Sequence, residues 1–439
     1  MRLARAILAV GLLHAVVVTS RAAGDDCWWK ALGNETLTAA VEFGLEQHPS
    51  VSAAAAAIRS ARAARDAAEA DGRPRLDVRL GARVGQERTG ATGFETEASD
   101  PYFGSALMTW ELDVLGRIDA RESAAEALVD VAAADRRGVE LMLSSAIALT
   151  LINIAAESDR LGYLETWRAH QTNILRRAER RRAAGVDSGA SVDVERARLS
   201  RANHRTLGAS IRLKRLRAEL AAWVGEPYAT NVIDSLATIS LPASPDMQGM
   251  TNVVQRPDIA RAWQAVRAAR ATSLAASRDR YPTLSLMASA AGEVSGDGET
   301  EPWQAWIGPV LELPLWKPAL AAREARDSAR AMQALRVFES ASREALRELS
   351  QAVTERTYAE AMEGYMRARA TELERIAESA LRRRDAGLIE ASEWLRAEQD
   401  VLEARNEAVE WRRRAFQSHL SLIRAWGGDP GMTAAAAKD

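Results

Sequence analysis

The sequence is poor in the residues that mark several common protein classes. Of 439 residues only one is cysteine, aromatic residues make up 5%, and 58 basic residues nearly balance 60 acidic ones. A lone cysteine excludes an intrachain disulfide. A formal net charge of −2 lacks the basic excess expected of a nucleic-acid-binding protein. Beyond residue 23 we find no apolar run of about 18 residues, so we expect no membrane-spanning helix in the mature chain.

Residue patterns that support catalysis are also missing. The five histidines are scattered without the spacing of a metal site. There is no glycine-rich phosphate loop and no nucleophile elbow. We therefore predict that the protein is not an enzyme and that it holds no metal and no cofactor.

The N-terminus has the three parts of a secretory signal peptide. Arg2 and Arg5 give it a positive start, residues 6–18 are mostly apolar, and residues 20–22 form a small-residue cleavage site. We assign the signal peptide to residues 1–23. Export from the cytoplasm follows from this assignment.

Cys27 lies close to the start of the mature chain, where a lipid anchor is a possible modification. Two aspartates, Asp25 and Asp26, precede it and fit a lipidation signal poorly. An unpaired thiol is therefore expected in preference to acylation.

The most informative feature that is present is a repeat. Motifs at Pro49, Pro74, Gly185 and Trp223 recur in the same order at Pro257, Pro282, Gly387 and Trp426. Collinear matches at nearly constant spacing indicate a tandem duplication. We place the first structural repeat at 24–227, a linker at 228–248, the second repeat at 249–430 and a disordered tail at 431–439.

Each repeat has the same predicted order of elements. A first helix, 36–70 or 250–280, ends before a proline, which removes a helical donor. Two extended runs follow, and then a long stretch without proline, 117–184 or 318–385. At 1.5 Å per residue such a helix is about 100 Å long. A glycine turn then leads into a returning helix.

The extended runs alternate apolar with polar or small residues. They lie at 76–84 and 102–114 in the first repeat, and less regularly at 284–290 and 303–313 in the second. Alternation places the two kinds of side chain on opposite faces, as in a transmembrane β-barrel strand. Polar loops are expected at 85–100 and 292–301. Aromatic residues near the predicted strand ends suggest a membrane girdle: Tyr102, Phe103, Trp110, Trp303 and Trp306.

Strand number sets a minimum assembly. Four strands cannot close a barrel, and open sheet edges are not tolerated in lipid. An eight-stranded barrel is filled by side chains, so a water-filled pore needs more strands than two chains supply. If the strands span a membrane and conduct, the protein is at least a trimer. The alternatives are soluble hairpins packed on the helices and an ordinary coiled-coil rod.

Several segments together resemble the TolC-like outer-membrane efflux proteins. They are Trp28-Trp29, His48-Pro49, the segment Trp-Glu-Leu-Asp-Val-Leu-Gly-Arg at 110–117, the two glycine turns, and the Trp-x-Gly-x-Pro endings at 223–227 and 426–430. The resemblance implies a mainly α protomer with a small β part, in which duplicated long helices form an α-barrel. It implies four transmembrane strands per subunit in a 12-stranded barrel of a homotrimer. It also implies a periplasmic adaptor and an inner-membrane pump as partners, and a place in the outer membrane of a Gram-negative-type bacterium.

The resemblance also assigns site residues. The turns that would dock the adaptor are Ala184-Gly185-Val186 and Ala386-Gly387-Leu388. Residues matching the periplasmic aperture are Asp193, Glu393 and Arg396, where Arg396 replaces an acid and weakens the case for cation selectivity. The implied function is a passive exit duct for small molecules in a tripartite efflux pump. A periplasmic coiled-coil scaffold or adaptor-like protein, and the exit duct of a protein-secretion system, remain open as alternatives.

Overall fold

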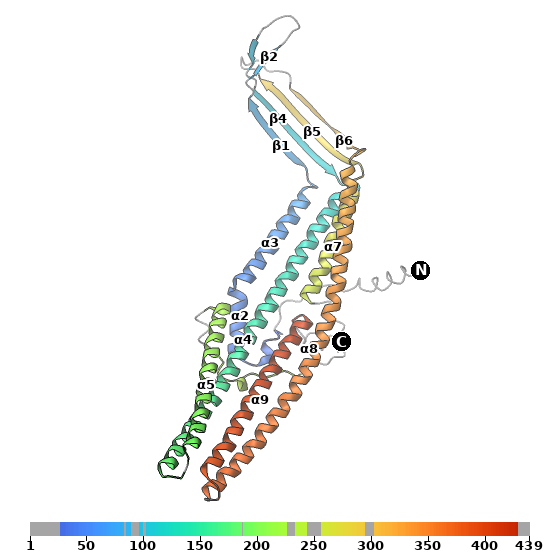
Figure 1. The fold of residues 1–439 in the computed structure, drawn as a ribbon. Coiled ribbons are helices and arrows are strands. Elements are labelled where there is room, and N and C mark those ends of the chain that lie inside the picture. The colour runs from blue at the N-terminus through green and yellow to red at the C-terminus, as the bar shows by residue number, and fades with distance from the viewer. Residues whose placement is uncertain are drawn as a thin grey trace, which may run out of the picture.

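The computed structural model describes residues 27–82, 85–88, 96–99, 102–186, 188–225, 233–243, 256–294 and 303–428. A four-stranded sheet lies at one end of the molecule, and the tips of the two hairpins α4–α5 (117–224) and α8–α9 (318–426) lie at the other (Figure 1). The predicted signal peptide, 1–23, and tail, 431–439, lie outside the described residues. The sheet and the hairpin tips therefore lie at opposite ends of the long axis of the molecule.

The sheet is built from both halves of the chain. Its strands are β1 (Arg75–Ala82), β4 (Tyr102–Leu112), β5 (Thr283–Val294) and β6 (Gln304–Glu312), in the order β1-β4-β5-β6. All neighbours are antiparallel, and β4 pairs with β5 along its whole length. The central pairing thus joins the two predicted repeats, while β1 and β6 remain edge strands.

The segment predicted as the polar loop 85–100 contains a second small sheet. Strands β2 (Gly85–Arg88) and β3 (Thr96–Ser99) pair antiparallel within it. The expectation of a plain loop was wrong there, because a polar hairpin has no hydrophobic alternation to reveal it.

Four helices form two long hairpins. They are α4 (Arg117–Ala183) with α5 (Gly189–Val224), and α8 (Pro318–Asp385) with α9 (Ala391–Trp426). These bounds lie within a few residues of the predicted ones, because the segments lack proline. The contact of α4 with α9 joins the two hairpins, and α7 (Pro257–Arg278) lies against both α4 and α8.

The single first helix predicted at 36–70 was wrong. The structure has α2 (Glu35–Gln47) and α3 (Pro49–Ala70), separated at His48. His48 is extended, at φ −70° and ψ 132°, because the ring of Pro49 disfavours the helical conformation for the residue before it. Its Nδ1 accepts a hydrogen bond from the Ser50 amide at 3.2 Å and so caps the second helix.

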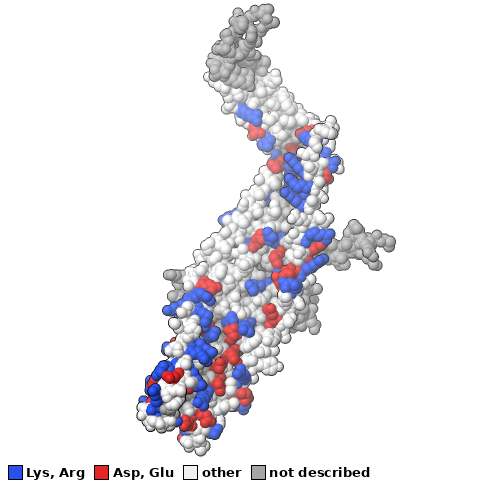
Figure 2. Space-filling view, in the orientation of Figure 1, with Lys and Arg blue, Asp and Glu red and all other residues white. Residues whose placement is uncertain are grey.

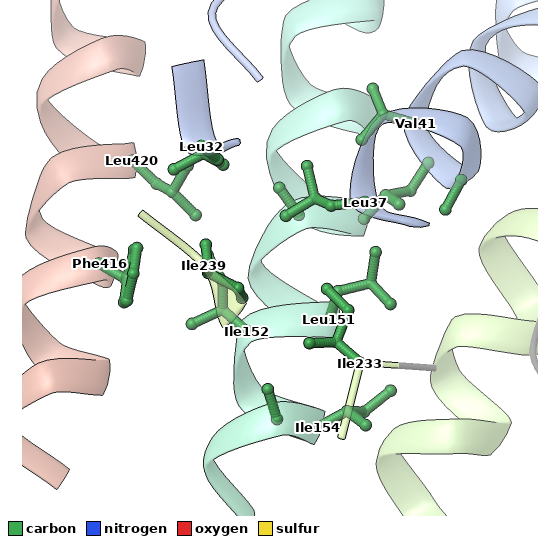
Figure 3. Close-up of a cluster of buried hydrophobic side chains, with 14 of the residues drawn as sticks. Leu32, Leu37, Val41, Leu151, Ile152, Ile154, Ile233, Ile239, Phe416 and Leu420 are labelled. Carbon is green, nitrogen blue, oxygen red and sulfur yellow. The ribbon is translucent and has the colours of Figure 1, made fainter. Parts of the chain in front are cut away.

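The main hydrophobic core lies midway along the molecule, away from both ends. Figure 3 shows side chains from α4 and α9 meeting those of the short N-terminal segment and of the segment that connects the repeats. That connection includes η2 (Leu236–Thr238), which with Ile233 and Ile239 packs on α4. Helix α4 buries Ala148, Leu151 and Ala155 here.

This core corrects one expectation about the sequence. Helix α4 contains an 18-residue window apolar enough to cross a membrane by length and composition, although none was expected. However, 61% of that window is buried inside the protein. Ile147, Leu151 and Ile154 are among the core residues that α4 contributes, so its apolar character is that of a core helix.

The connection between the repeats is held in place by buried polar groups. The guanidinium of Arg356 is almost fully buried and donates hydrogen bonds to the carbonyls of Pro242 at 2.8 Å and Ala415 at 3.0 Å. It also pairs with Glu360. Burial, together with the positive charge of Arg356, lowers the pKa of the neighbouring His419 to about 4, so this imidazole is neutral near pH 7.

Candidate channel surfaces

One face of the sheet is apolar across all four strands. The pairing register aligns Leu76 with Met108, Met108 with Ala288, and Ala288 with Ile307. Because side chains alternate in a strand, the residues two positions away lie on the same face. That face is formed by Leu76, Val78, Leu80, Tyr102, Gly104, Ala106, Met108, Trp110, Leu112, Leu284, Leu286, Ala288, Ala290, Gly292, Val294, Ala305, Ile307, Pro309 and Leu311.

The opposite face is mixed and carries the charges of the strands. Arg75, Asp77 and Arg79 lie on it in β1, and Glu111 lies on it in β4. Arg75 and Asp77 form an ion pair at 3.3 Å. Figure 2 shows that charge is sparse over the sheet and dense over the far halves of the long helices.

The register divides the predicted aromatic girdle between the two faces. Tyr102 and Trp110 lie on the apolar face, and Trp303 lies beside Gly292 on that face. Phe103 and Trp306 have the opposite parity and lie on the mixed face. The ring of Phe103 covers Gly81, where an added Cβ would come within 2.4 Å of it. Only the first three therefore keep the placement that a girdle requires.

The segment at 110–117 forms the junction between sheet and helices. Trp110 Nε1 donates to the Gly72 carbonyl at 3.0 Å, which ties the strand to the end of α3. Asp113 accepts from the Asp119 amide at 2.9 Å in the first turn of α4. Gly116, at φ 71°, adopts the left-handed conformation that a glycine tolerates best. The motif therefore fixes the angle at which the strand leads into the long helix.

Charges complete this junction. Arg117 pairs with Glu111 through both of its carboxylate oxygens and with Asp279 at 3.3 Å, and Arg121 reaches the same Asp279 oxygen at 2.9 Å. Partial burial lowers the pKa of Arg117, because it disfavours the charged guanidinium. The carboxylates of Glu111 and Asp279 outweigh that effect and raise the pKa above its ordinary value. Asp279 follows α7, so the junction links the two repeats. The sequence pattern does not reveal this link, because residues 117 and 279 are far apart in the chain.

Both helical hairpins turn in the same way. Gly185 and Gly387 have φ of 74° and 73°. The amide of Val186 donates to the Arg181 carbonyl, and that of Leu388 donates to the Arg383 carbonyl, both at 2.9 Å. These are Schellman caps, which end a helix at a glycine and expose the next side chain. Val186 and Leu388 are thus presented to solvent at the tips.

The predicted aperture residues lie beyond these turns but on different hairpins. Asp193 is exposed on α5 and pairs with Arg196 at 2.8 Å. Glu393 and Arg396 are exposed on α9, in the other hairpin. At helical spacing the same face of α9 continues to Asp400 and Glu403, which are also exposed. None of these four α9 residues has an ion-pair partner in the part of the chain that the structure describes.

A buried polar cluster near the tips was not predicted. Gln171 on α4 is almost fully buried, donates to Glu195 on α5 at 2.7 Å, and accepts from Gln399 on α9 at 2.7 Å. Gln171 lies seven residues after Leu164, which is also buried, so helical periodicity could have predicted its inward position. Near it, Arg384 stacks on Trp394 at 4.2 Å. Gln171 therefore connects three helices of the two hairpins.

A sequence model of the family described as "Outer membrane efflux protein" matches residues 43–226 and 253–428, which together make up most of the chain. The chain belongs to this outer membrane efflux protein family. The two matched segments lie on either side of the connection between the repeats.

Individual relatives agree with this assignment. The pyoverdine export outer membrane protein OpmQ of Pseudomonas aeruginosa is 26% identical over 416 residues, covering 91% of this chain and 87% of the relative. The fold is similar to that of the outer membrane protein VceC of Vibrio cholerae, with a TM-score of 0.80 and 23% identity over 92% of this chain and 98% of the other. The CmeC channel of Campylobacter jejuni gives a TM-score of 0.80 and 17% identity over 96% and 93% of the two chains.

Membership in this family of outer membrane efflux proteins places the protein in the outer membrane, with the long helices as its periplasmic portion. The predicted fold class, a mainly α protomer with a small β part and duplicated long helices, is confirmed. The family is one of channels and not of enzymes. Among the described residues no group of three or more potential metal ligands comes together.

The single cysteine of this efflux protein lies at the first described position. Cys27 is half-buried, and its carbonyl accepts a hydrogen bond from the Lys30 amide at 2.9 Å. The absence of acylation at Cys27 stays a prediction.

Proposed function

We propose that the protein is a homotrimeric exit duct, which passively conducts small molecules across the periplasm and the outer membrane as part of a tripartite efflux pump. The observation that carries this proposal is the four-stranded sheet, with its two unpaired edges and one continuous apolar face. Edge β1 carries unpaired backbone groups on one side, and edge β6 carries them on the other. In lipid such edges must be paired.

Copies of the same chain supply the missing partners. Successive antiparallel neighbours leave β1 and β6 running in opposite directions, so β6 of one copy can continue the antiparallel sheet at β1 of the next. Three copies give a 12-stranded barrel, wide enough for a water-filled lumen. The apolar face then meets lipid, and the face with Arg75, Asp77 and Arg79 lines the lumen.

The helical part of the molecule offers a surface on which partner proteins can dock and deliver cargo to a passive duct. The exposed turns at Val186 and Leu388 form small apolar knobs at the end farthest from the sheet. We assign them to docking of a periplasmic adaptor, which in turn recruits an inner-membrane pump. Asp193, Glu393 and Arg396 lie just past these turns, so symmetric copies would surround an aperture there.

A relative in the family supports small molecules as the cargo. OpmQ is named for pyoverdine export, and we carry over the export of small molecules, not pyoverdine itself. A protein-secretion duct would share the same fold, and no feature of the described residues favours it. The alternative of a periplasmic coiled-coil scaffold is dropped, because the chain belongs to the outer membrane efflux protein family.

Planar-bilayer recording of the purified protein tests the proposal. Discrete, long-lived conductance steps are expected, together with a trimer that migrates intact in detergent gels until it is heated. A correctly folded protein that never conducts, or that forms no oligomer in detergent, would overturn it. Selective passage of an unfolded polypeptide, with no passage of small solutes, would favour secretion instead.

A further inference from the structure

A recess lies on one surface of the wall formed by α4, α8 and α9, in which α9 lies between the other two helices (Figure 1). Its volume is about 570 Å³, which is within the range of small-molecule sites. Met142, Ala146 and Leu149 of α4 contribute apolar groups to its lining, and Tyr358 of α8 and Trp411 of α9 contribute aromatic rings. The recess is separate from the sheet, the tips and the aperture residues.

This recess faces away from the main hydrophobic core. Ser145 lines it two residues before the core residue Ile147, and Arg414 lines it two residues before the core residue Phe416. Two residues correspond to roughly 200° around a helix, so recess and core lie on opposite faces of α4 and α9. The N-terminal segment and the connection between the repeats pack on the core side. Inside a barrel those segments would obstruct the duct, so they lie outside it and the recess faces the lumen.

A buried hydroxyl in the recess lacks a hydrogen bond. Ser145 is 3% exposed, yet its Oγ has no partner within the part of the chain that the structure describes. By contrast, the hydroxyls of Ser144, Thr150 and Ser418 each donate to a carbonyl of their own helix. An unpaired buried polar group is unfavourable. The Ser145 hydroxyl therefore indicates a ligand that supplies the missing hydrogen bond.

The charged groups of the recess favour an anion. Among the described residues that line it, Arg414 and Arg424 stand against one carboxylate, that of Glu355. Arg414 pairs with Glu410 at 3.4 Å, but Glu410 also pairs with Arg413 at 2.5 Å. One carboxylate cannot neutralise two guanidiniums, so Arg414 keeps positive charge available to a ligand.

The aromatic groups lie beside that charge. The rings of Tyr358 and Trp411 meet edge to face, with centroids 5.6 Å apart. The guanidinium of Arg414 stacks over the Trp411 ring at 4.6 Å from its centroid. A single small molecule can therefore present a flat ring to the aromatic pair and an anionic group to the guanidinium.

We propose that this recess binds small aromatic carboxylates, one per chain, on the lumenal surface of the duct. The ring of the ligand packs against Tyr358 and Trp411. Its carboxylate accepts hydrogen bonds from Arg414 and Arg424, and Ser145 supplies a further one. The wall of the duct thus holds one chemical class of cargo on its way through. This inference rests on the duct proposed above.

Equilibrium dialysis of the purified full-length protein against 2-naphthoate tests the site. We expect saturable binding of one naphthoate per chain, and about tenfold weaker binding of the neutral 2-naphthamide, which lacks the charged group. Arg414→Gln should weaken naphthoate binding about tenfold and leave naphthamide binding unchanged. Ser145→Ala should weaken naphthoate binding about threefold.

An arginine outside the recess provides the matched control. Arg375 is exposed on α8 and pairs with Glu372, so Arg375→Gln should bind naphthoate as the wild type does. Equal affinities of the wild type and Arg414→Gln for naphthoate would overturn the site. A loss in Arg375→Gln as large as that in Arg414→Gln would also overturn it, because the effect would then not be specific to the recess.

Reversal potentials in planar bilayers under a salt gradient test the lumenal position. A bound carboxylate offsets the positive charge of Arg414, so saturating naphthoate should shift the wild-type channel towards cation selectivity. Arg414→Gln should show that shift without naphthoate and change little when naphthoate is added. A conducting channel whose reversal potential ignores naphthoate would overturn the lumenal site while the duct stands. A folded protein that binds naphthoate but never conducts would overturn the duct and, with it, the lumenal position.

Discussion

At the scale of single residues, the junction between sheet and helices depends on charges that are partly withdrawn from water. Replacing Arg117 by methionine keeps the length of the side chain but leaves Glu111 and Asp279 without their shared partner. We expect a loss of about 2–3 kcal/mol in the free energy of unfolding, measured by urea titration of the reconstituted protein.

The exposed pair of Arg65 and Asp66 serves as the control for that change. Its atoms are 2.6 Å apart, but both side chains are well exposed. Arg65→Met should cost less than about 1 kcal/mol, because water screens an exposed ion pair. Equal losses in the two variants would show that the junction charges contribute no more than surface charges.

His419 gives the folded protein a pH dependence of known sign. Its pKa is about 4 when folded and about 6.5 when unfolded, so between these values only the unfolded chain binds the proton. The free energy of unfolding is therefore highest above pH 6.5. It decreases as the pH falls towards 4, by up to about 3 kcal/mol per chain. Unfolding of wild type and of His419→Leu, measured from pH 7.5 to 4, should diverge over this range. The exposed His204, replaced by glutamine, should leave the profile unchanged.

At the scale of elements, the contact between the two hairpins near their tips centres on Gln171. In Gln399→Glu the donor to Gln171 is replaced by an acceptor of the same size, so one hydrogen bond becomes a repulsion. Losing about 1.4 kcal/mol shifts an equilibrium tenfold. We therefore expect about a tenfold rise in the open fraction of the channel in planar bilayers. Gln333→Glu, an exposed position on α8, should have no such effect, and an unchanged open fraction in both variants would remove Gln171 from any role in closure.

We expect substitutions at the tips to change efflux without changing the channel wall. Val186→Asp combined with Leu388→Asp places charges on the two apolar knobs without touching the glycine caps. Efflux in cells should fall at least about tenfold through weaker adaptor docking, while conductance of the purified protein stays at the wild-type level. Loss of conductance would instead assign these residues to the pore, and unchanged efflux would place adaptor docking elsewhere.

At the scale of the whole molecule, barrel assembly depends on which face of the sheet meets lipid. Val78→Lys puts a charge on the apolar face, at a cost of about 2–4 kcal/mol per chain near the bilayer centre. The yield of heat-modifiable trimer in vesicles should drop accordingly. Arg79→Gln, one position away on the mixed face, should assemble normally. Should the two variants behave alike, the faces have been assigned wrongly.

Particular residues show how much of the structure could be predicted from the sequence. The alternation at 76–84 and the absence of proline from 117–184 were sufficient to predict strand β1 and helix α4, since both patterns are local. The break at His48 was also a local effect, and it was visible in Pro49. In contrast, the aromatic residues near the strand ends do not all lie on one face. Phe103 and Trp306 lie on the mixed face and Tyr102 lies on the apolar face, and this division depends on the pairing register of the strands.

The long helices, the amphipathic strands and their repeated order can be predicted from local sequence, because periodicity and proline placement act over a few residues. The same local sequence contains the motifs that resemble the family. The pairing of β4 with β5, the contact of Arg117 with Asp279 and the connection of three helices by Gln171 appear only in the folded chain. Those contacts join residues far apart in the chain, and they exist only when the two repeats pack against each other.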